Sequence, residues 1–411
     1  MTAIDPTAER NARAHQYSQE GRGDLAIPLF EEVLADRVRV LGPDHPETLA
    51  SRNNLAVAYE SVGRVGEAIP LFEEVLADRV RVLGPDHPDT LASRNNLAVA
   101  YESVGRLGEA IPLFEEVLAD RVRVLGADHP DTLTSRGNLA YAYRAAGRLG
   151  EAIALFEEVL ADRVRVLGED HPDTLVSRNN LAYAYESAGR LGEAITLYEQ
   201  VLADRVRVLG ADHPDTLASR NNLAGAYESA GRLGEAITLF EEVLADRVRV
   251  LGADHPDTLV SRNNLAGAYE SAGRLGEAIT LFEEVLADRV RVLGDDHPDT
   301  LISRNNLAYA YRAAGRLGEA IPLYEEVLAD RVRVLGDDHP HTLASRNNLA
   351  GAYHAVGRVD DARALLENTL KVCEEVLSPG HPLTTRVREN LETLEREMNQ
   401  PPAPSPESSE E

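Results

Sequence analysis

A period of 42 residues constrains this chain more than any other feature of its sequence. Residues 210–251 and 252–293 differ at one position only, Ala218 against Val260. Equivalent units open at Gly42, Gly84, Gly126, Gly168, Gly210, Gly252, Gly294 and Gly336. A fixed period of this size is typical of a stacked array, in which each unit buries its apolar face only against its neighbours. We therefore expect a quasi-one-dimensional stack rather than separate globular domains.

Glycine and proline divide each unit into two expected helices. In the first full unit, Pro46 suits the first position of a helix, with Asp44 or His45 as its cap. This helix A ends at Gly63, a left-handed C-terminal residue, and helix B starts near residue 65 or 66. At helical spacing, the expected core is Leu49, Leu55, Ala56, Tyr59 and Val62 on helix A, and Ala68, Leu71, Phe72, Val75, Leu76, Val80 and Leu83 on helix B.

The two ends of the array depart from the repeated unit. The first unit has a diverged first helix, and the last unit diverges from Asp360 onward, as expected of capping elements. The predicted organisation is a disordered lead (1–7), nine 42-residue helix-pair repeats (8–377), a C-terminal capping helix (378–399) and a disordered acidic Pro/Ser tail (400–411).

The pattern within each unit resembles a known repeat. Its positions are Leu55, Ala56, Tyr59, Gly63, Ala68 and Phe72, which follow the tetratricopeptide repeat pattern. The 42-residue period, with Leu-Gly-x-Asp-His-Pro-x-Thr, Asn-Asn-Leu-Ala and Glu-Ala-x-x-Leu-[Phe/Tyr], is similar to the repeats of kinesin light chains and their bacterial relatives, over roughly residues 8–398. The resemblance implies an all-α fold, a right-handed superhelical solenoid of antiparallel helix pairs whose A helices line a concave groove where peptides bind.

Four positions of helix A form a narrow stripe beside and largely opposite the core, at about 100° per residue. They are positions 50, 53, 57 and 60 of the first full unit and their equivalents, which are the main positions that vary between units. At position 57, three units carry glycine in mid-helix, at a cost of roughly 1 kcal/mol each relative to alanine. A groove that alternates bulky tyrosine with glycine has hollows the size of a side chain. Neutral drift in a very stable array would produce the same pattern.

The resemblance assigns this stripe to the groove. It implies a ladder of asparagine carboxamides that grip the backbone of an extended peptide, with tyrosines forming pockets between them, and a carboxamide offers both donors and an acceptor. The candidate residues are Asn53, Asn95, Asn179, Asn221, Asn263, Asn305, Asn347, Tyr141, Tyr183, Tyr309, Arg144 and Arg312. Which asparagine of each Asn-Asn pair faces the groove stays open. The alternative is that these exposed positions drift because nothing packs on them.

Arg52 and its equivalents depart from the tetratricopeptide pattern, which has a large apolar residue at this position. The position projects toward the core, and a half-buried guanidinium needs a carboxylate partner. We expect Glu67, Glu73 or Glu74 on helix B to be that partner. The pattern indicates a structural ion pair repeated in each unit rather than a ligand site.

Neither a metal site nor catalytic chemistry is indicated. Nine histidines recur at one per unit, and neighbouring units lie about 10 Å apart, too far to share a zinc ion whose bonds to histidine are about 2.0 Å. Their place just before a helix-start proline favours capping. No Gly-rich phosphate loop, His-Glu-x-x-His or Gly-x-Ser-x-Gly motif is present, and Cys373 has no patterned histidine nearby. We expect no cofactor and no enzyme activity.

Charge and composition limit the kinds of partner that the chain can have. The net charge of −27 argues against nucleic acid or an anionic membrane as the main partner. The lone Cys373, the absence of a signal-like start and the absence of long apolar runs favour a cytoplasmic protein, and the composition suggests a bacterial source. The expected function is a non-catalytic scaffold, monomeric by preference, that binds a neutral or basic peptide or disordered segment. The alternatives are an architectural or self-associating array, or the sensor arm of a bacterial signalling system.

Overall fold

A computed structural model describes residues 6–19, 21–377 and 380–398, and these residues form nineteen α-helices and no strand. The helices are α1 (Pro6–Gln19), α2 (Gly23–Leu41), α3 (Pro46–Ser61), α4 (Val65–Leu83), α5 (Pro88–Ser103), α6 (Leu107–Leu125), α7 (Pro130–Ala145), α8 (Leu149–Leu167), α9 (Pro172–Ser187), α10 (Leu191–Leu209), α11 (Pro214–Ser229), α12 (Leu233–Leu251), α13 (Pro256–Ser271), α14 (Leu275–Leu293), α15 (Pro298–Ala313), α16 (Leu317–Leu335), α17 (Pro340–Ala355), α18 (Val359–Val376) and α19 (Pro382–Met398). The predicted tail lies outside the described residues, as does the predicted lead except for Pro6 and Thr7, which belong to α1.

The helix boundaries predicted from glycine and proline are confirmed. Of the two expected caps, His45 takes the role, because its Nδ1 accepts a hydrogen bond from the backbone N–H of Glu47 at 3.2 Å. Every recurrent histidine makes the same bond to the residue two positions later. Gly63, in the turn between α3 and α4, has φ 81°, a left-handed conformation that a residue with a Cβ adopts only under strain.

The apolar core runs continuously between the helices of successive units. Leu49, Ala56 and Phe72 are fully buried, and each buried phenylalanine of this kind contributes on the order of 2–3 kcal/mol to the folded state. The expectation for Val80 was wrong, since 39% of this side chain is exposed, while its neighbour Arg79 is only 7% exposed. Near its C-terminal end, helix B therefore turns a guanidinium rather than a valine toward the adjoining unit.

Arg79 is buried because it joins helix B of one unit to helix A of the next. Its Nη1 donates to the carbonyl oxygen of Asp89 at 2.9 Å and to Oγ of Ser93 at 2.7 Å. Ser93 is fully buried, so the bond gives its hydroxyl oxygen a donor inside the core. Arg121, Arg163, Arg205, Arg247, Arg289 and Arg331 repeat the arrangement along the array.

Arg52 forms a structural ion pair, but two of the three expected partners were wrong. Its Nη1 donates to Asp78 at 2.7 Å, while Glu74 lies at 4.0 Å. Asp78 also accepts from Arg81. Because the two helices are antiparallel, Arg52 in the first half of α3 lies beside the second half of α4, where Asp78 is found. Glu67 instead pairs with Arg64, and Glu73 accepts from the hydroxyl of Tyr101.

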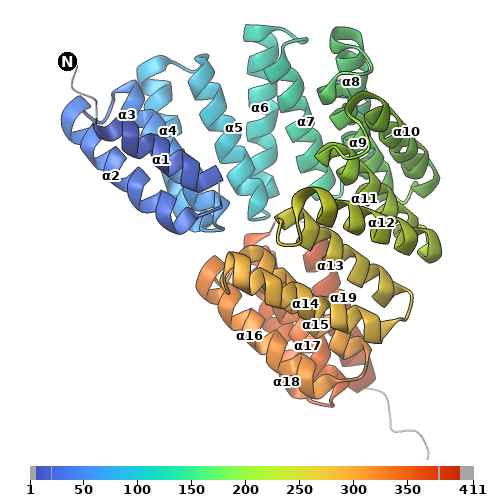
Figure 1. The fold of residues 1–411 in the computed structure, drawn as a ribbon. Coiled ribbons are helices and arrows are strands. Elements are labelled where there is room, and N and C mark those ends of the chain that lie inside the picture. The colour runs from blue at the N-terminus through green and yellow to red at the C-terminus, as the bar shows by residue number, and fades with distance from the viewer. Residues whose placement is uncertain (1–5, 20, 378–379, 399–411) are drawn as a thin grey trace, which may run out of the picture.

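The helix pairs stack into a superhelical solenoid that curves back on itself (Figure 1). A Cβ built on Gly63 would lie 2.9 Å from Leu335, and one built on Gly105 would lie 2.9 Å from Leu377. The turns between α3 and α4 and between α5 and α6 therefore pack against the ends of α16 and α18, which we call the inter-turn contact. At the C-terminal end, α19 packs on α18. None of the described helices is long and apolar enough to cross a bilayer.

Candidate functional site

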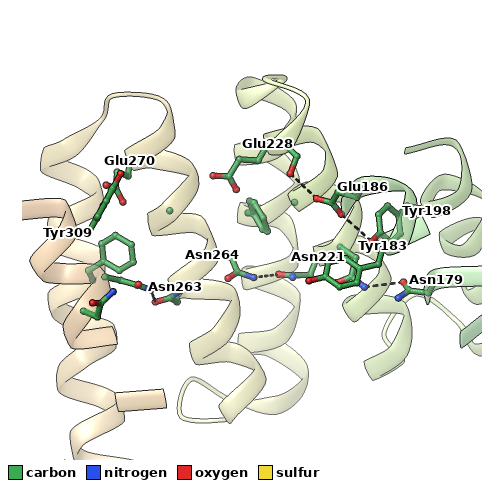
Figure 2. A pocket seen from close by; sticks show the side chains of 18 of the residues that line it. Asn179, Tyr183, Glu186, Tyr198, Asn221, Glu228, Asn263, Asn264, Glu270 and Tyr309 are labelled. Carbon is green, nitrogen blue, oxygen red and sulfur yellow. Dashed lines mark hydrogen bonds between the residues drawn. The ribbon is translucent and has the colours of Figure 1, made fainter. Parts of the chain in front are cut away.

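A cavity of about 730 Å³ opens along the A helices in the middle of the array. Its walls come from α7, α9, α11, α13 and α15, and the B helices add three aromatic rings, those of Tyr198, Phe240 and Phe282. Figure 2 shows carboxamides, carboxylates and aromatic rings from successive helices gathered around this space. The middle of the solenoid therefore presents a continuous polar surface built from one helix per unit.

The asparagine pairs form a hydrogen-bonded ladder from unit to unit. The second asparagine of each pair donates to the first asparagine of the preceding unit, as Asn222 does to Oδ1 of Asn179 at 3.0 Å (Figure 2). The same bond joins Asn96 to Asn53, Asn138 to Asn95, Asn264 to Asn221, Asn306 to Asn263, Asn348 to Asn305 and Asn390 to Asn347. Both members of the pairs at 179, 221, 263 and 305 line the cavity. Each rung uses one N–H of the second carboxamide and one oxygen of the first, so each carboxamide keeps further groups for other partners.

The ladder is interrupted at one end of the cavity. Gly137 occupies the place of the first asparagine, so Asn180 in the next unit has no carboxamide to which it can donate. Tyr141 lies there instead, edge-on to Phe156 with ring centroids 5.1 Å apart. Burial raises the pKa of Tyr141, against the opposing effects of Arg144 and of a hydrogen bond with Asn180. The interruption and the tyrosine together mark where the cavity begins.

Glycine makes the space in the middle of the cavity, and tyrosine bounds it. Tyr183 and Tyr309 are 44% and 50% exposed, and they stand at equivalent positions on either side of two glycine units. A Cβ built on Gly225 or Gly267 would meet no atom within 4 Å. The hollows expected from the sequence are therefore present, as two adjacent open positions between larger side chains.

Three glutamates follow the same wall, and two of them are satisfied by the next unit. Ser229 donates to Glu186 at 2.8 Å (Figure 2). Ser271 donates to Glu228 at 2.7 Å. Glu270 has no such donor, because the next unit carries alanine at the equivalent place, and its Oε1 is buried without a hydrogen-bond partner among the described residues. Burial raises the pKa of Glu270 to about 7, and the neighbouring Glu228 adds to the shift.

These glutamates were absent from the site residues expected from the sequence. The signal that could have found them is the residue that follows position 60, which is serine in most units and alanine at 145, 313 and 355. Whether a glutamate is satisfied depends on that residue in the following unit, so the pattern is visible only when neighbouring copies are compared in pairs.

The cavity brings together seven of the twelve residues expected to line the groove. These are Tyr141, Asn179, Tyr183, Asn221, Asn263, Asn305 and Tyr309. Asn347 and Arg312 border a separate cavity of about 180 Å³ near α19. Asn53 and Asn95 lie in the ladder but outside both spaces, and the Arg144 guanidinium stacks over the ring of Tyr183 at 4.5 Å.

The groups around the cavity suit hydrogen bonding to an extended polypeptide. Carboxamides match peptide N–H and C=O groups, and carboxylates match basic side chains. The described residues contain no group of three or more His, Cys, Asp or Glu side chains placed to hold a metal ion.

Family models for the tetratricopeptide repeat match most of the chain. One model matches residues 6–79, 189–247, 215–289, 263–331, 303–367 and 341–403, and a second matches residues 90–131 and 132–173. No curated protein matches the chain.

Solved structures of repeat proteins are similar to the chain. The nearly identical TPR-like repeats of a Podosopora anserina kinesin light chain-like protein share 40% identity, covering 50% of this chain and 97% of that one, with a TM-score of 0.43. BtubC from P. vanneervenii shares 21% identity, covering 57% and 92%, with a TM-score of 0.42. A tetratricopeptide repeat protein from Parabacteroides merdae shares 13% identity, covering 74% and 98%, with a TM-score of 0.50, a likeness of fold.

Proposed function

The chain belongs to the tetratricopeptide repeat family, whose members are protein-interaction scaffolds, and we propose that it binds an extended peptide or disordered segment of a partner along its A helices. The observation that carries the proposal is the asparagine ladder beside an open cavity at Gly225 and Gly267. The ladder holds each carboxamide in one orientation. These side chains are therefore already ordered before a ligand binds, which lowers the entropy cost of binding.

The spacing of the units fits an extended chain. Neighbouring helix pairs lie about 10 Å apart, and an extended peptide rises about 3.3 Å per residue, so about three ligand residues pass each unit. A peptide group can then meet a carboxamide at every unit, while side chains between these points enter the space at the glycines. Affinity grows with the number of units engaged.

The charge of the wall favours a neutral or basic ligand. Glu186, Glu228 and Glu270 border the cavity, and no lysine or arginine is among its lining residues. An acidic ligand would meet like charge at close range, which disfavours its binding. We infer that the protein acts as a monomer with one peptide seated along its middle units.

Filling the cavity tests the proposal. The double variant Gly225→Tyr and Gly267→Tyr uses a side chain that other units already carry at this position, so helicity should be unchanged. Peptides selected from a random library on the full chain should bind this variant at least ten times more weakly, measured by fluorescence anisotropy. The matched double alanine variant should lose much less affinity. Equal binding by the tyrosine variant would contradict a ligand at this cavity.

Removing the carboxamides tests the ladder separately. Asn179, Asn221, Asn263 and Asn305 changed together to alanine should abolish binding of the selected peptides. Asn53 and Asn95 changed to alanine also remove rungs, but outside the cavity, so this control should bind normally. Growth of the light-scattering mass with protein concentration, without peptide, would favour a self-associating array instead.

A further inference from the structure

Glu270 differs from the two glutamates that precede it on the cavity wall. In the preceding units a serine of the next helix donates to the carboxylate, whereas the residue opposite Glu270 is Ala313. The Oε1 atom of Glu270 is inaccessible to solvent and has no donor among the described residues. A buried carboxylate oxygen without a donor is costly, and a hydrogen-bond donor from a ligand lowers that cost.

The arginine at the equivalent position of the following unit does not supply that donor. Arg312 stands at the position equivalent to Glu270, but its Nη1 would lie 2.9 Å from a Cβ built on Gly351, so the guanidinium packs over the unit beyond. Arg312 borders the smaller cavity near α19 rather than the space that Glu270 lines. No ion pair to Glu270 is formed by any cation of residues 6–19, 21–377 or 380–398.

We propose that Glu270 is the specificity-determining residue of the cavity and that it receives a basic side chain, arginine or lysine, of the bound peptide. The inference rests on the proposed peptide-binding function and adds the chemistry of one ligand residue. Glu228 already accepts a hydrogen bond from Ser271, so the missing donor is that of Glu270.

The surroundings of Glu270 suit a long basic side chain rather than a small cation. Tyr309 lies beside it on the cavity wall and is half exposed, and Gly267 leaves open space one turn earlier on the same helix (Figure 2). An apolar stem can pass through the space at Gly267 and lie against the tyrosine ring, while the charged end reaches the carboxylate.

Peptide selection on the full chain provides the test. The library has seven residues, uncharged at every position except the centre, which carries any of the twenty amino acids. We expect the selected peptides to carry arginine or lysine at the centre. Resynthesis with citrulline in place of arginine removes the charge and keeps the shape, and it should weaken binding about tenfold in fluorescence anisotropy.

Two variants assign that loss to Glu270. In Glu270→Gln the arginine and citrulline peptides should bind within about twofold of each other. In Ala313→Ser the carboxylate keeps its charge but gains the donor that Glu186 and Glu228 already have, so the preference should fall several-fold. The matched control Glu228→Gln should keep most of the tenfold preference.

The outcomes separate this inference from the proposed function. Peptides that lose affinity for the tyrosine-filled cavity but show no preference for arginine over citrulline would overturn the role of Glu270 and leave the groove intact. A preference that persists in Glu270→Gln would also overturn it. A library from which the full chain selects no peptide would overturn both.

Discussion

The residue at position 57 of each unit sets the local depth of the concave surface. Val57, Tyr183 and Gly225 occupy equivalent places on the same helical framework. The framework itself changes little with them, because the core residues below are nearly the same in the full units, with Phe72 replaced by Tyr198 and Tyr324. Depth along the groove is therefore controlled by a single side chain per unit, and it can be altered without rebuilding the fold.

Glycine at this position should cost stability that alanine restores. Gly225→Ala and Gly267→Ala place a methyl group where no atom lies within 4 Å, so each should raise the free energy of unfolding by roughly 1 kcal/mol in urea titrations followed by circular dichroism. Gly273→Ala is the matched opposite case. Its φ of 72° strains any residue with a Cβ, so this variant should be less stable than the parent. A loss of stability in the first two variants would mean that the space is not open.

Glu102 should make stability depend on pH. Burial raises its pKa to about 7, against the attraction of Arg144. A carboxyl group whose folded pKa lies above its unfolded value stabilises the fold below pH 4.5, and this contribution is lost as the pH rises through 7. Glu102→Gln removes the titration, so its melting temperature should match the parent at pH 4 and exceed it at pH 8. At pH 8 the free energy of unfolding of this variant should exceed that of the parent by about 1–2 kcal/mol, after allowing for partial solvent exposure. An equal difference at both pH values would contradict this origin.

Each helix is joined to its neighbours by polar bonds as well as by the apolar core. Helix A carries the asparagine ladder, and helix B contributes the Arg79 bond to Ser93 and the Asp78 bond to Arg52. These bonds join side chains that are widely separated in the sequence but lie at the same level of adjacent helices. Each helix position is thus fixed by bonds on two sides, which specify its register against its neighbours.

Restoring the interrupted rung should strengthen the junction between α7 and α9. Gly137→Asn supplies the carboxamide oxygen that the ladder lacks at Asn180, which otherwise bonds to Tyr141, and the unit with Asn179 and Tyr183 shows that an asparagine fits beside a tyrosine one turn later. We expect a gain of roughly 1 kcal/mol in urea unfolding, partly from helix propensity and partly from the hydrogen bond. Gly137→Ala supplies the propensity alone, so the difference between the two variants measures the rung. No difference would show that the rung contributes nothing to stability.

Helix boundaries, caps and most of the core could be predicted because glycine, proline and apolar spacing act locally. The partner of Arg52 was harder, since it depends on how two antiparallel helices are aligned, which spacing along one helix does not reveal. Val80 was wrongly placed in the core, and Arg79 was not considered, for a related reason. Both lie toward the core side of an isolated helix, and only the position of the next unit decides which is covered. The unsatisfied state of Glu270 depends on Ala313, in a different unit.

At the scale of the whole molecule, curvature brings distant units together. The inter-turn contact places Gly63 against Leu335, residues that no local pattern connects. A cavity of about 660 Å³ lies beside it, lined by residues of both parts of the chain. The radius of the superhelix is set by the sum of many small rotations between units, so it could not be predicted from one unit.

A charge in the inter-turn contact should open the superhelix. Leu335→Asp places a carboxylate against Gly63, so the largest dimension in small-angle X-ray scattering should increase while the helical signal in circular dichroism stays near that of the parent. Leu251→Asp is the matched control, because it changes the equivalent leucine in a unit away from the contact. The same expansion in both variants would show that the contact does not hold the turns together.

The inter-turn contact also bears on how such a chain can change by duplication. Near-identical neighbouring copies recombine readily in a gene, and the number of copies then grows or shrinks by whole units. The glycine of the turn and the leucine at the end of helix B recur in the full 42-residue units, so a change in copy number brings an equivalent pair to the place where the turns meet. The array can therefore gain or lose units over generations and form the same contact again, whereas the open position at Glu270 depends on which unit follows it, since the residue opposite is Ala313.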